Sequence, residues 1–120
     1  VYYLFLDNRF YFFSSPDSRH IRESAANRGK ASAAIFEDAD RYDRIRGTQM
    51  SGRVGQPESS ASAVKAAGLY VKRFGIQAVT GHCLRFIEKK YRALIYCFVP
   101  DQILFMDNSL GFGTRQEIHL

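Results

Sequence analysis

The chain has 120 residues, enough for one domain with a small hydrophobic core. A hydrophobic content of 46% and a charged content of 24% are typical of a globular protein, and the net charge of +5 favours anionic ligands. No apolar run approaches the roughly 18–20 residues of a membrane-spanning helix, so we expect no membrane partner. We expect a single domain over residues 1–120.

Cysteine and histidine usage bears on compartment and metal binding. Cys83 and Cys97 lack the C-x-x-C spacing of redox and metal motifs, so we expect reduced thiols in a cytoplasmic protein. The three histidines are scattered and no carboxylate spacing accompanies them, so we predict no metal site. The sequence begins at Val1, inside a strand-like run, and we expect an N-terminal piece of the domain to be absent.

The N-terminal region predicts a β-hairpin followed by a helix. Two aromatic and apolar runs, 1–6 and 10–13, flank an Asp-Asn turn. The helix is predicted to begin after an N-cap at Asp17 or Ser18 and to end near Gly29, which suits the left-handed position after a helix.

The rest of the chain predicts further strands and helices. In chain order they are strand 31–36, strand 44–54, helix 60–74, a shorter helix within 80–91, strand 93–99, strand 103–106 and a Gly-rich tail at 107–113. Pro100 and Asp101 predict a turn between the last two strands. Antiparallel neighbours with short links and helices packed outside predict a small β-barrel of α+β type.

The segment from Phe12 to His20 makes the most concrete chemical suggestion. An aromatic strand ends in the hydroxyls of Ser14 and Ser15, and the helix that follows has Arg19 in its first turn. Helix N-termini expose unpaired N–H groups and partial positive charge, and hydroxyls and an arginine add further donors for an anion. The pattern is typical of a phosphate site, and a helix cap with a solvated arginine is the alternative.

Three stretches resemble the pyridoxamine 5'-phosphate oxidase-like, FMN-binding split-barrel superfamily. The first, 4–28, contains Phe-Tyr-Phe-Phe-Ser-Ser-Pro-Asp-Ser-Arg-His before a helix, and the second, 46–52, is similar to the family's middle strand. The third, Asp-Asn-Ser-Leu-Gly-Phe-Gly at 107–113, resembles the C-terminal signature of a small bacterial branch. The resemblance implies an antiparallel split β-barrel of about six strands, flanked by two to three helices.

The resemblance also implies a phosphate site at the strand–helix junction. Phe13 and Ser14 match the family's aromatic–hydroxyl pair beside the flavin phosphate, and Arg19 matches the arginine that pairs with the phosphate, with Ser18 next to it. His20 falls where many members have lysine, which implies a weaker and pH-dependent grip on the anion.

Other implied positions surround the flavin ring. Tyr3 lies in the strand whose backbone lines the isoalloxazine, and Gly47, next to Thr48, falls where the oxidases have a glutamine that reaches the flavin. Asn108 and Phe112 are expected at the mouth of the site, in a loop that closes over a flavin edge. The resemblance implies no particular catalytic residue.

These expectations lead to a homodimeric FMN-binding protein, an oxidoreductase of unknown substrate or a remnant of one, with the flavin at the dimer interface. Counterparts of the residues that hold the vitamin substrate are missing, so we expect no true pyridoxamine phosphate oxidase activity. The alternative is a split barrel that has lost flavin and binds another anion or a protein partner, which the departures at His20 and Gly47 favour. A deazaflavin or haem in place of FMN is left open.

The densest basic cluster consists of Arg85, Lys89, Lys90 and Arg92. It predicts the solvated basic end of a helix. No helix-turn-helix, zinc-finger or RNP-like aromatic motif accompanies it, so we expect no nucleic-acid partner. Nucleic-acid contact through this cluster is kept as a third hypothesis, with an affinity that falls steeply with salt.

Overall fold

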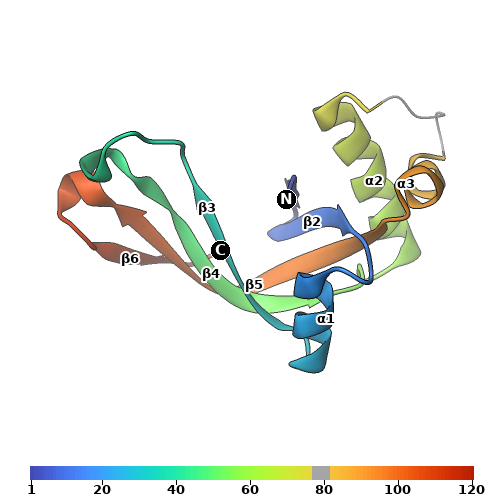
Figure 1. The fold of residues 1–120 in the computed structure, drawn as a ribbon, viewed down its shortest axis with the longest axis horizontal. Helices are drawn as coiled ribbons and strands as arrows, with labels where there is room; N and C mark the ends of the chain where they lie inside the picture. The colour runs from blue at the N-terminus through green and yellow to red at the C-terminus, as the bar shows by residue number, and fades with distance from the viewer. Residues whose placement is uncertain (77–81) are drawn as a thin grey trace.

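The computed structural model describes residues 1–76 and 82–120, and Figure 1 shows their arrangement. The strands are β1 (Leu4–Leu6), β2 (Arg9–Ser14), β3 (Lys30–Phe36), β4 (Arg46–Gly55), β5 (Leu94–Asp107) and β6 (Arg115–Ile118). The helices are α1 (Arg19–Ala26), α2 (Ser60–Phe74) and α3 (Cys83–Tyr91), with short 3-10 turns η1 (Tyr42–Arg44) and η2 (Asn108–Leu110). Among the described helices, none is both long enough and apolar enough to span a membrane.

All six strands form one antiparallel sheet in the order β1-β2-β5-β4-β3, and β6 also pairs with β5. β4 hydrogen-bonds along one edge of β5. The other edge pairs first with β2, where Phe10 faces Phe98, and then with β6, where Gln116 faces Phe105. The sheet is open within the single chain, because β1 and β3 lie at its two ends.

The predicted turn at Pro100 and Asp101 is wrong, because β5 continues through both residues as one strand of 14 residues. The pairing register shifts opposite them, between Ser51 and Gly52 of β4. A bulge of this kind accepts a proline, which cannot donate a ladder hydrogen bond. A Cβ on Gly52 would lie 2.8 Å from the Cα of Pro100 and would also collide with the preceding carbonyl oxygen, so the glycine permits the close crossing.

The bounds predicted for α2 are confirmed. The hydroxyl of Ser59 accepts a 3.1 Å hydrogen bond from the amide of Ser62 at the N-terminus, and Gly75 ends the helix with a left-handed φ of 64°. The shorter helix predicted within 80–91 begins at Cys83, and residues 80–81 lie outside the described part of the chain. The strand β6 was not predicted, because its four residues are exposed and carry no alternating apolar pattern.

Two hydrophobic clusters cover opposite faces of β2 and β5. One lies under α2 and α3 and contains Tyr11, Tyr70 and Ile87, while the other contains Phe12 and Ile21 and lies on the face contacted by α1. Strand side chains alternate between faces, so neighbouring aromatic residues of β2 serve different clusters. The fold is α+β, as predicted, and α2 and α3 pack together on one side of the strands (Figure 1).

Candidate functional site

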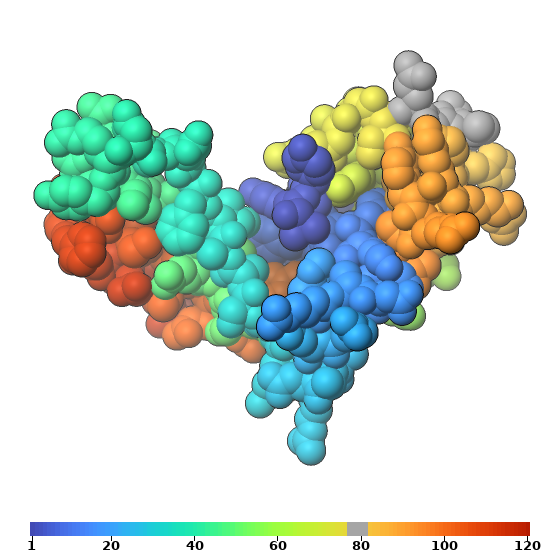
Figure 2. All heavy atoms as spheres, in the orientation of Figure 1, coloured from blue at the N-terminus to red at the C-terminus, as the bar shows by residue number. Residues whose placement is uncertain are grey.

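An apolar groove of 520 Å³ separates the N-terminal segment from β3. We call the part of the sheet formed by β3, β4, β5 and β6 the arm. Figure 2 shows the molecule hollowed between the dark blue N-terminal residues and the teal part of this arm, which contains β3. The residues lining the groove are Val1, Tyr3, Phe10, Phe12, His20, Met50, Val54, Phe98 and residues 31–36. Its volume lies within the range of about 300–1,000 Å³ that is usual for small-molecule sites.

The groove exists because large and small side chains face each other across it. β2 and β5 contribute the rings of Phe10, Phe12 and Phe98, whereas β3 contributes Ala31 and Ala33 from its half-buried face. Alanines leave space where larger residues would fill the cluster. The result is a slot with an aromatic wall and an aliphatic wall, a shape that suits a flat ring system.

His20, which lines the groove, belongs to a polar cluster at the start of α1, whose other members Ser14 and Ser18 lie behind it and do not line the groove themselves. The hydroxyl of Ser14 lies 2.9 Å from Nε2 of His20 and 3.0 Å from the hydroxyl of Ser18, which is 3.4 Å from the same Nε2. Ser14 is buried, and His20 lines the groove. Two hydroxyls and an imidazole therefore meet at the N-terminus of a helix, where donors for an anion accumulate.

Arg19 points away from this cluster. Its Nε donates a 2.7 Å hydrogen bond to Glu23 one turn along α1, and its side chain is 85% exposed. Arg19 is not among the residues that line the groove. The helical phase explains this placement, because successive residues of a helix project about 100° apart and His20 already faces the groove.

Tyr3 also lines the groove and is held by neighbouring side chains. The guanidinium of Arg73 lies 5.7 Å from the centroid of the Tyr3 ring, and the ring of Phe10 contacts Tyr3 edge to face at 5.5 Å. The hydroxyl of Tyr70 donates a 3.3 Å hydrogen bond to the carbonyl oxygen of Tyr2. These contacts hold the N-terminal segment against α2 and so fix one wall of the groove.

Three further predicted site residues, Phe13, Gly47 and Thr48, are not among the residues that line the groove. Phe13 lies on the opposite face of β2 and packs edge to face against Tyr70, with ring centroids 5.0 Å apart. Gly47 and Thr48 lie in β4 opposite Phe36 and Ile35 of β3 and do not line the groove. A Cβ on Gly47 would collide with this neighbouring strand, which explains the glycine by close backbone approach.

Asn108 and Phe112 belong to the tip of the arm. Asn108 is buried, and its Nδ2 donates a 2.8 Å hydrogen bond to the carbonyl oxygen of Tyr42 in η1. The backbone amide nitrogen of Asn108 donates a 3.0 Å hydrogen bond to the carbonyl oxygen of Ile45. Phe112 is 83% exposed and contacts the ring of Tyr42 edge to face. Both residues therefore contact other parts of the arm and not the groove.

The groove contains aromatic residues that the sequence interpretation did not assign to a site, chiefly Phe10, Phe12 and Phe98. The signal that could have found two of them is the two-residue period of a strand. Tyr11 and Phe13 pack under α2, so the alternate residues of β2 must face the other side.

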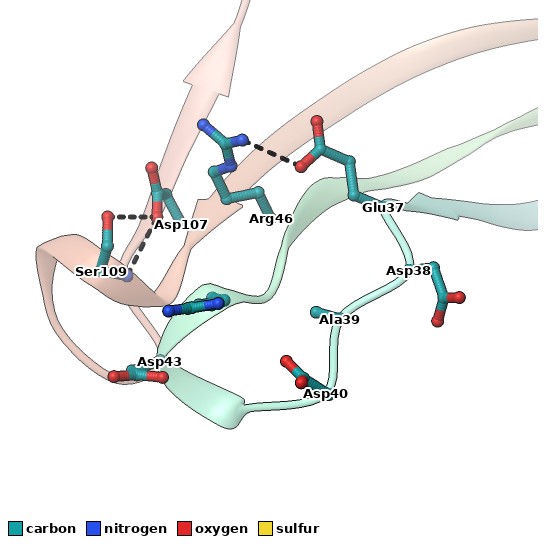
Figure 3. A pocket seen from close by; sticks show the side chains of 9 residues that line it. Glu37, Asp38, Ala39, Asp40, Asp43, Arg46, Asp107 and Ser109 are labelled. Carbon is teal, nitrogen blue, oxygen red and sulfur yellow. Dashed lines mark hydrogen bonds and ion pairs between the residues drawn. The ribbon is translucent and has the colours of Figure 1, made fainter.

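A second hollow, of 580 Å³, lies at the tip of the arm and is lined mainly by charged residues (Figure 3). Several of its charges are paired locally: Arg46 pairs with Glu37 at 2.9 Å, and Asp107 accepts hydrogen bonds from the hydroxyl and the amide of Ser109 at 2.6 and 3.0 Å, whereas Oδ1 of Asp43 is buried without a hydrogen-bond partner among the described residues. The two bonds from Ser109 lower the pKa of Asp107. The described residues contain no group of three His, Cys, Asp or Glu side chains arranged to hold a metal ion. We therefore take the aromatic groove as the candidate site.

No protein-family model matches the chain. Its sequence is 27% identical over 106 residues to UPF0306 proteins from two strains of Klebsiella pneumoniae. The match covers 88% of this chain and 63% of those proteins, so the chain spans less than two thirds of the length of these curated relatives.

Three solved structures are similar to the chain over almost its whole length. They are Campylobacter jejuni ChuZ (TM-score 0.72, 16% identity, 98% of this chain and 46% of that one), the conserved hypothetical protein Rv2991 from Mycobacterium tuberculosis (0.68, 14%, 99% and 73%), and a heme binding protein from Mycobacterium smegmatis (0.67, 17%, 97% and 44%). At these identities the likeness concerns the fold. The chain has the α+β split-barrel architecture that its sequence predicted, built on an antiparallel sheet of six strands with three helices.

Proposed function

We propose that the groove binds FMN and that the protein is a flavin-dependent oxidoreductase that works as a homodimer. One observation carries the proposal: an apolar slot with an aromatic wall is bordered by His20, whose imidazole is hydrogen-bonded to the Ser14 hydroxyl in a polar cluster at a helix N-terminus. A flavin mononucleotide has the matching chemistry, a flat ring system joined to a dianionic phosphate. The residues present fit this group.

The chain's own residues would divide the work of binding. Phe10 and Phe12 would contact one face of the ring, and Tyr3 would close the end of the slot. Ser14 and Ser18 would donate hydrogen bonds to the phosphate, with His20 adding charge when it is protonated. When bound, the flavin supplies the redox chemistry, and the protein supplies orientation and exclusion of water.

Arg19 belongs to the same proposal through exchange of its partner. Its pair with Glu23 is exposed and one helical turn long, and pairs of this kind contribute only about 0.3–0.5 kcal/mol. Hydrogen bonds to a charged group contribute about 1.5–3 kcal/mol, so a phosphate beside Ser14 and Ser18 would compete well for the guanidinium.

The homodimer is proposed from the open side of the groove. Phe36, at the end of β3, lines the groove and is 43% exposed, and β3 is the last strand of the sheet. A second copy over this side would cover exposed apolar surface and exclude water from the ring.

As further parts of the proposal, we place the protein in the cytoplasm, because Cys83 and Cys97 are free thiols. We also assign the 107–113 segment to the bacterial branch that it resembles.

Haem is the second candidate ligand, because a structurally similar Mycobacterium smegmatis protein is described as heme binding. Haem is also flat and anionic, and the imidazole of His20 borders the groove. Since Nε2 of His20 is hydrogen-bonded to Ser14, coordination through that atom would require the bond to break.

The test is a titration of the purified protein with FMN and, separately, with hemin. We expect saturable quenching of flavin fluorescence, weakened about tenfold in Ser14→Ala, the equivalent of one hydrogen bond. Ser15→Ala is the matched control, because the exposed Ser15 hydroxyl accepts a bond from the amide of Asp17 instead.

Two further variants test the exchange of Arg19. Arg19→Ala should weaken FMN binding by about 1.5–3 kcal/mol, whereas Glu23→Gln should leave it unchanged or tighten it, because the guanidinium is released. Absence of saturation up to about 1 mM FMN, a dissociation constant equivalent to only about 4 kcal/mol, would contradict the flavin proposal. Saturable hemin binding without FMN binding would favour the second candidate.

A further inference from the structure

The positive charge of the chain is concentrated in the α2–α3 segment, residues 60–92. This segment holds seven of the 17 Lys and Arg residues and one of the 12 acidic residues, so it carries a net charge of +6 and the rest of the chain a net charge of −1. The seven are Lys65, Lys72, Arg73, Arg85, Lys89, Lys90 and Arg92. The uneven distribution is a property of one layer of the fold, because α2 and α3 pack against each other (Figure 1).

Four nitrogen-bearing side chains lie in α3 or at its ends, and we call them the basic stripe: His82, Arg85, Lys89 and Arg92. Arg85 and Lys89 lie four residues apart on one helical face, while His82 is the N-cap and Arg92 the C-cap, with a left-handed φ of 49°. All four are exposed. The opposite side of the helix is committed to the core, where Ile87 is buried.

The aromatic rings of Phe86 and Tyr91 lie beside this basic stripe. His82, Arg85, Phe86, Lys89 and Lys90 line a shallow hollow of 510 Å³. The ammonium of Lys90 lies 5.4 Å from the centroid of the Phe86 ring and 5.6 Å from that of Tyr91. Cations held beside flat rings offer both charge and a stacking surface to one ligand.

Among the described residues, no ion pair neutralises the cations of this segment. The four ion pairs found among the described residues all join arginines outside residues 60–92 to nearby carboxylates. Within α3 the only acidic residue is Glu88. The surface therefore presents an uncompensated positive field, which attracts polyanions.

We propose that the stripe on α3 binds single-stranded nucleic acid, with phosphates on Arg85, Lys89 and Arg92 and a base stacked at Phe86. Acidic polypeptides offer charge but no bases for the rings of Phe86 and Tyr91. An anionic membrane would need an apolar helix face to insert, and that face of α3 is packed against α2 and the sheet. The absence of a known motif led the sequence interpretation away from this partner, and the hollow around Phe86 changes that interpretation.

The experiment measures fluorescence anisotropy of labelled oligothymidylate of about 12 nucleotides, within the range of known single-strand sites. We expect Arg85→Gln, Lys89→Gln and Arg92→Gln together to lower affinity at least tenfold at low salt. The slope of log affinity against log salt should fall by about 2, since each phosphate contact in a single strand contributes about 0.7. Cofactor binding in the groove should be unchanged, which separates this proposal from the preceding one.

The matched control removes the same charge elsewhere, through Arg22→Gln, Lys30→Gln and Arg44→Gln, all at exposed positions. It should retain most of the affinity. Phe86→Leu keeps apolar volume against the core and should weaken oligothymidylate binding but not the binding of polyglutamate.

Four results overturn the proposal: no binding at low salt, equal losses in the two triple variants, equal affinity for oligothymidylate and polyglutamate, or binding to phosphatidylserine vesicles without binding to the oligonucleotide.

Discussion

The side-chain amide of Asn108 donates a 2.8 Å hydrogen bond to the carbonyl oxygen of Tyr42, which lies 66 residues earlier in the chain. This bond joins η2 to η1 and closes the tip of the arm formed by β3, β4, β5 and β6. A buried polar side chain with satisfied partners at such a junction holds two loops in a fixed arrangement.

Asn108→Ala should therefore destabilise the protein by about 1–3 kcal/mol, because the Tyr42 carbonyl oxygen loses its partner. Urea unfolding measures the change. Ser109→Ala, which removes an exposed hydrogen bond to Asp107, should change the free energy of unfolding by less than about 0.5 kcal/mol. FMN affinity should be unaffected in both variants, and a loss confined to Asn108→Ala would place this residue at the mouth of the site after all.

The crossing of β4 and β5 gives a second prediction. Gly52→Ala should cost about 1–3 kcal/mol or more, because the new Cβ would meet the backbone of Val99 and Pro100. Gly55→Ala, in the same strand, is the control, since nothing lies within 4 Å of its Cβ position. The control should be neutral or slightly stabilising through the unfolded chain. Equal effects of the two substitutions on the urea midpoint would refute the explanation by close approach.

The buried thiol of Cys97 predicts a loss of stability at alkaline pH. Burial raises the pKa of this thiol in the folded protein. The neutral thiol is thus favoured on folding, and the stability it contributes is complete below the unfolded pKa of about 8.5 and is lost as the pH rises above it. The loss should reach at most about 1.4 kcal/mol per pH unit.

Urea unfolding between pH 7.5 and 9.5 checks this dependence. Cys97→Ala should flatten the pH profile in this interval, although it lowers stability at every pH by leaving a small cavity. Cys83→Ala should keep the wild-type profile. An unchanged slope in Cys97→Ala would show that another group is responsible.

A fourth prediction concerns the wall of the groove next to Tyr3. Tyr70→Phe removes the hydroxyl that donates to the Tyr2 carbonyl oxygen, while the ring packing with Phe13 and Phe74 is retained. We expect a modest loss of stability, about 0.5–1 kcal/mol, and faster amide exchange in β1. If the groove is the ligand site, FMN affinity should also fall. Unchanged exchange rates in β1 would mean that the hydroxyl does not anchor this segment.

The elements predicted well from the sequence are those whose signals are local. The helix α2 has a serine N-cap, a glycine stop and apolar residues at helical spacing, and the hairpin β1–β2 has aromatic runs around a turn. The turn predicted at Pro100 failed because β5 takes up Asp101 as an extra residue opposite the Ser51–Gly52 step of β4, and Gly52, 48 residues before Pro100, leaves room for the crossing. Local propensity cannot reveal such a partner.

The candidate site followed the same division. The hydroxyl and imidazole cluster of Ser14, Ser18 and His20 was visible as a strand–helix junction, and the structure brings these three side chains together. The direction of Arg19 follows from the helical phase of α1 and from its pair with Glu23, and the resemblance did not reveal it. The aromatic wall required knowing which face of β2 lies under α2, and that is decided by packing between distant segments.

The length of β5 has a consequence for how the domain comes apart. One strand of 14 residues hydrogen-bonds to β2, β4 and β6, so the half under the helices and the half in the arm share a single backbone ladder. Unfolding of either half removes strand partners from the other half, so heat or urea should unfold both halves in one cooperative transition. A cut in the chain between Val99 and Gln102 would divide β5, and each of the two fragments would need the other in order to fold.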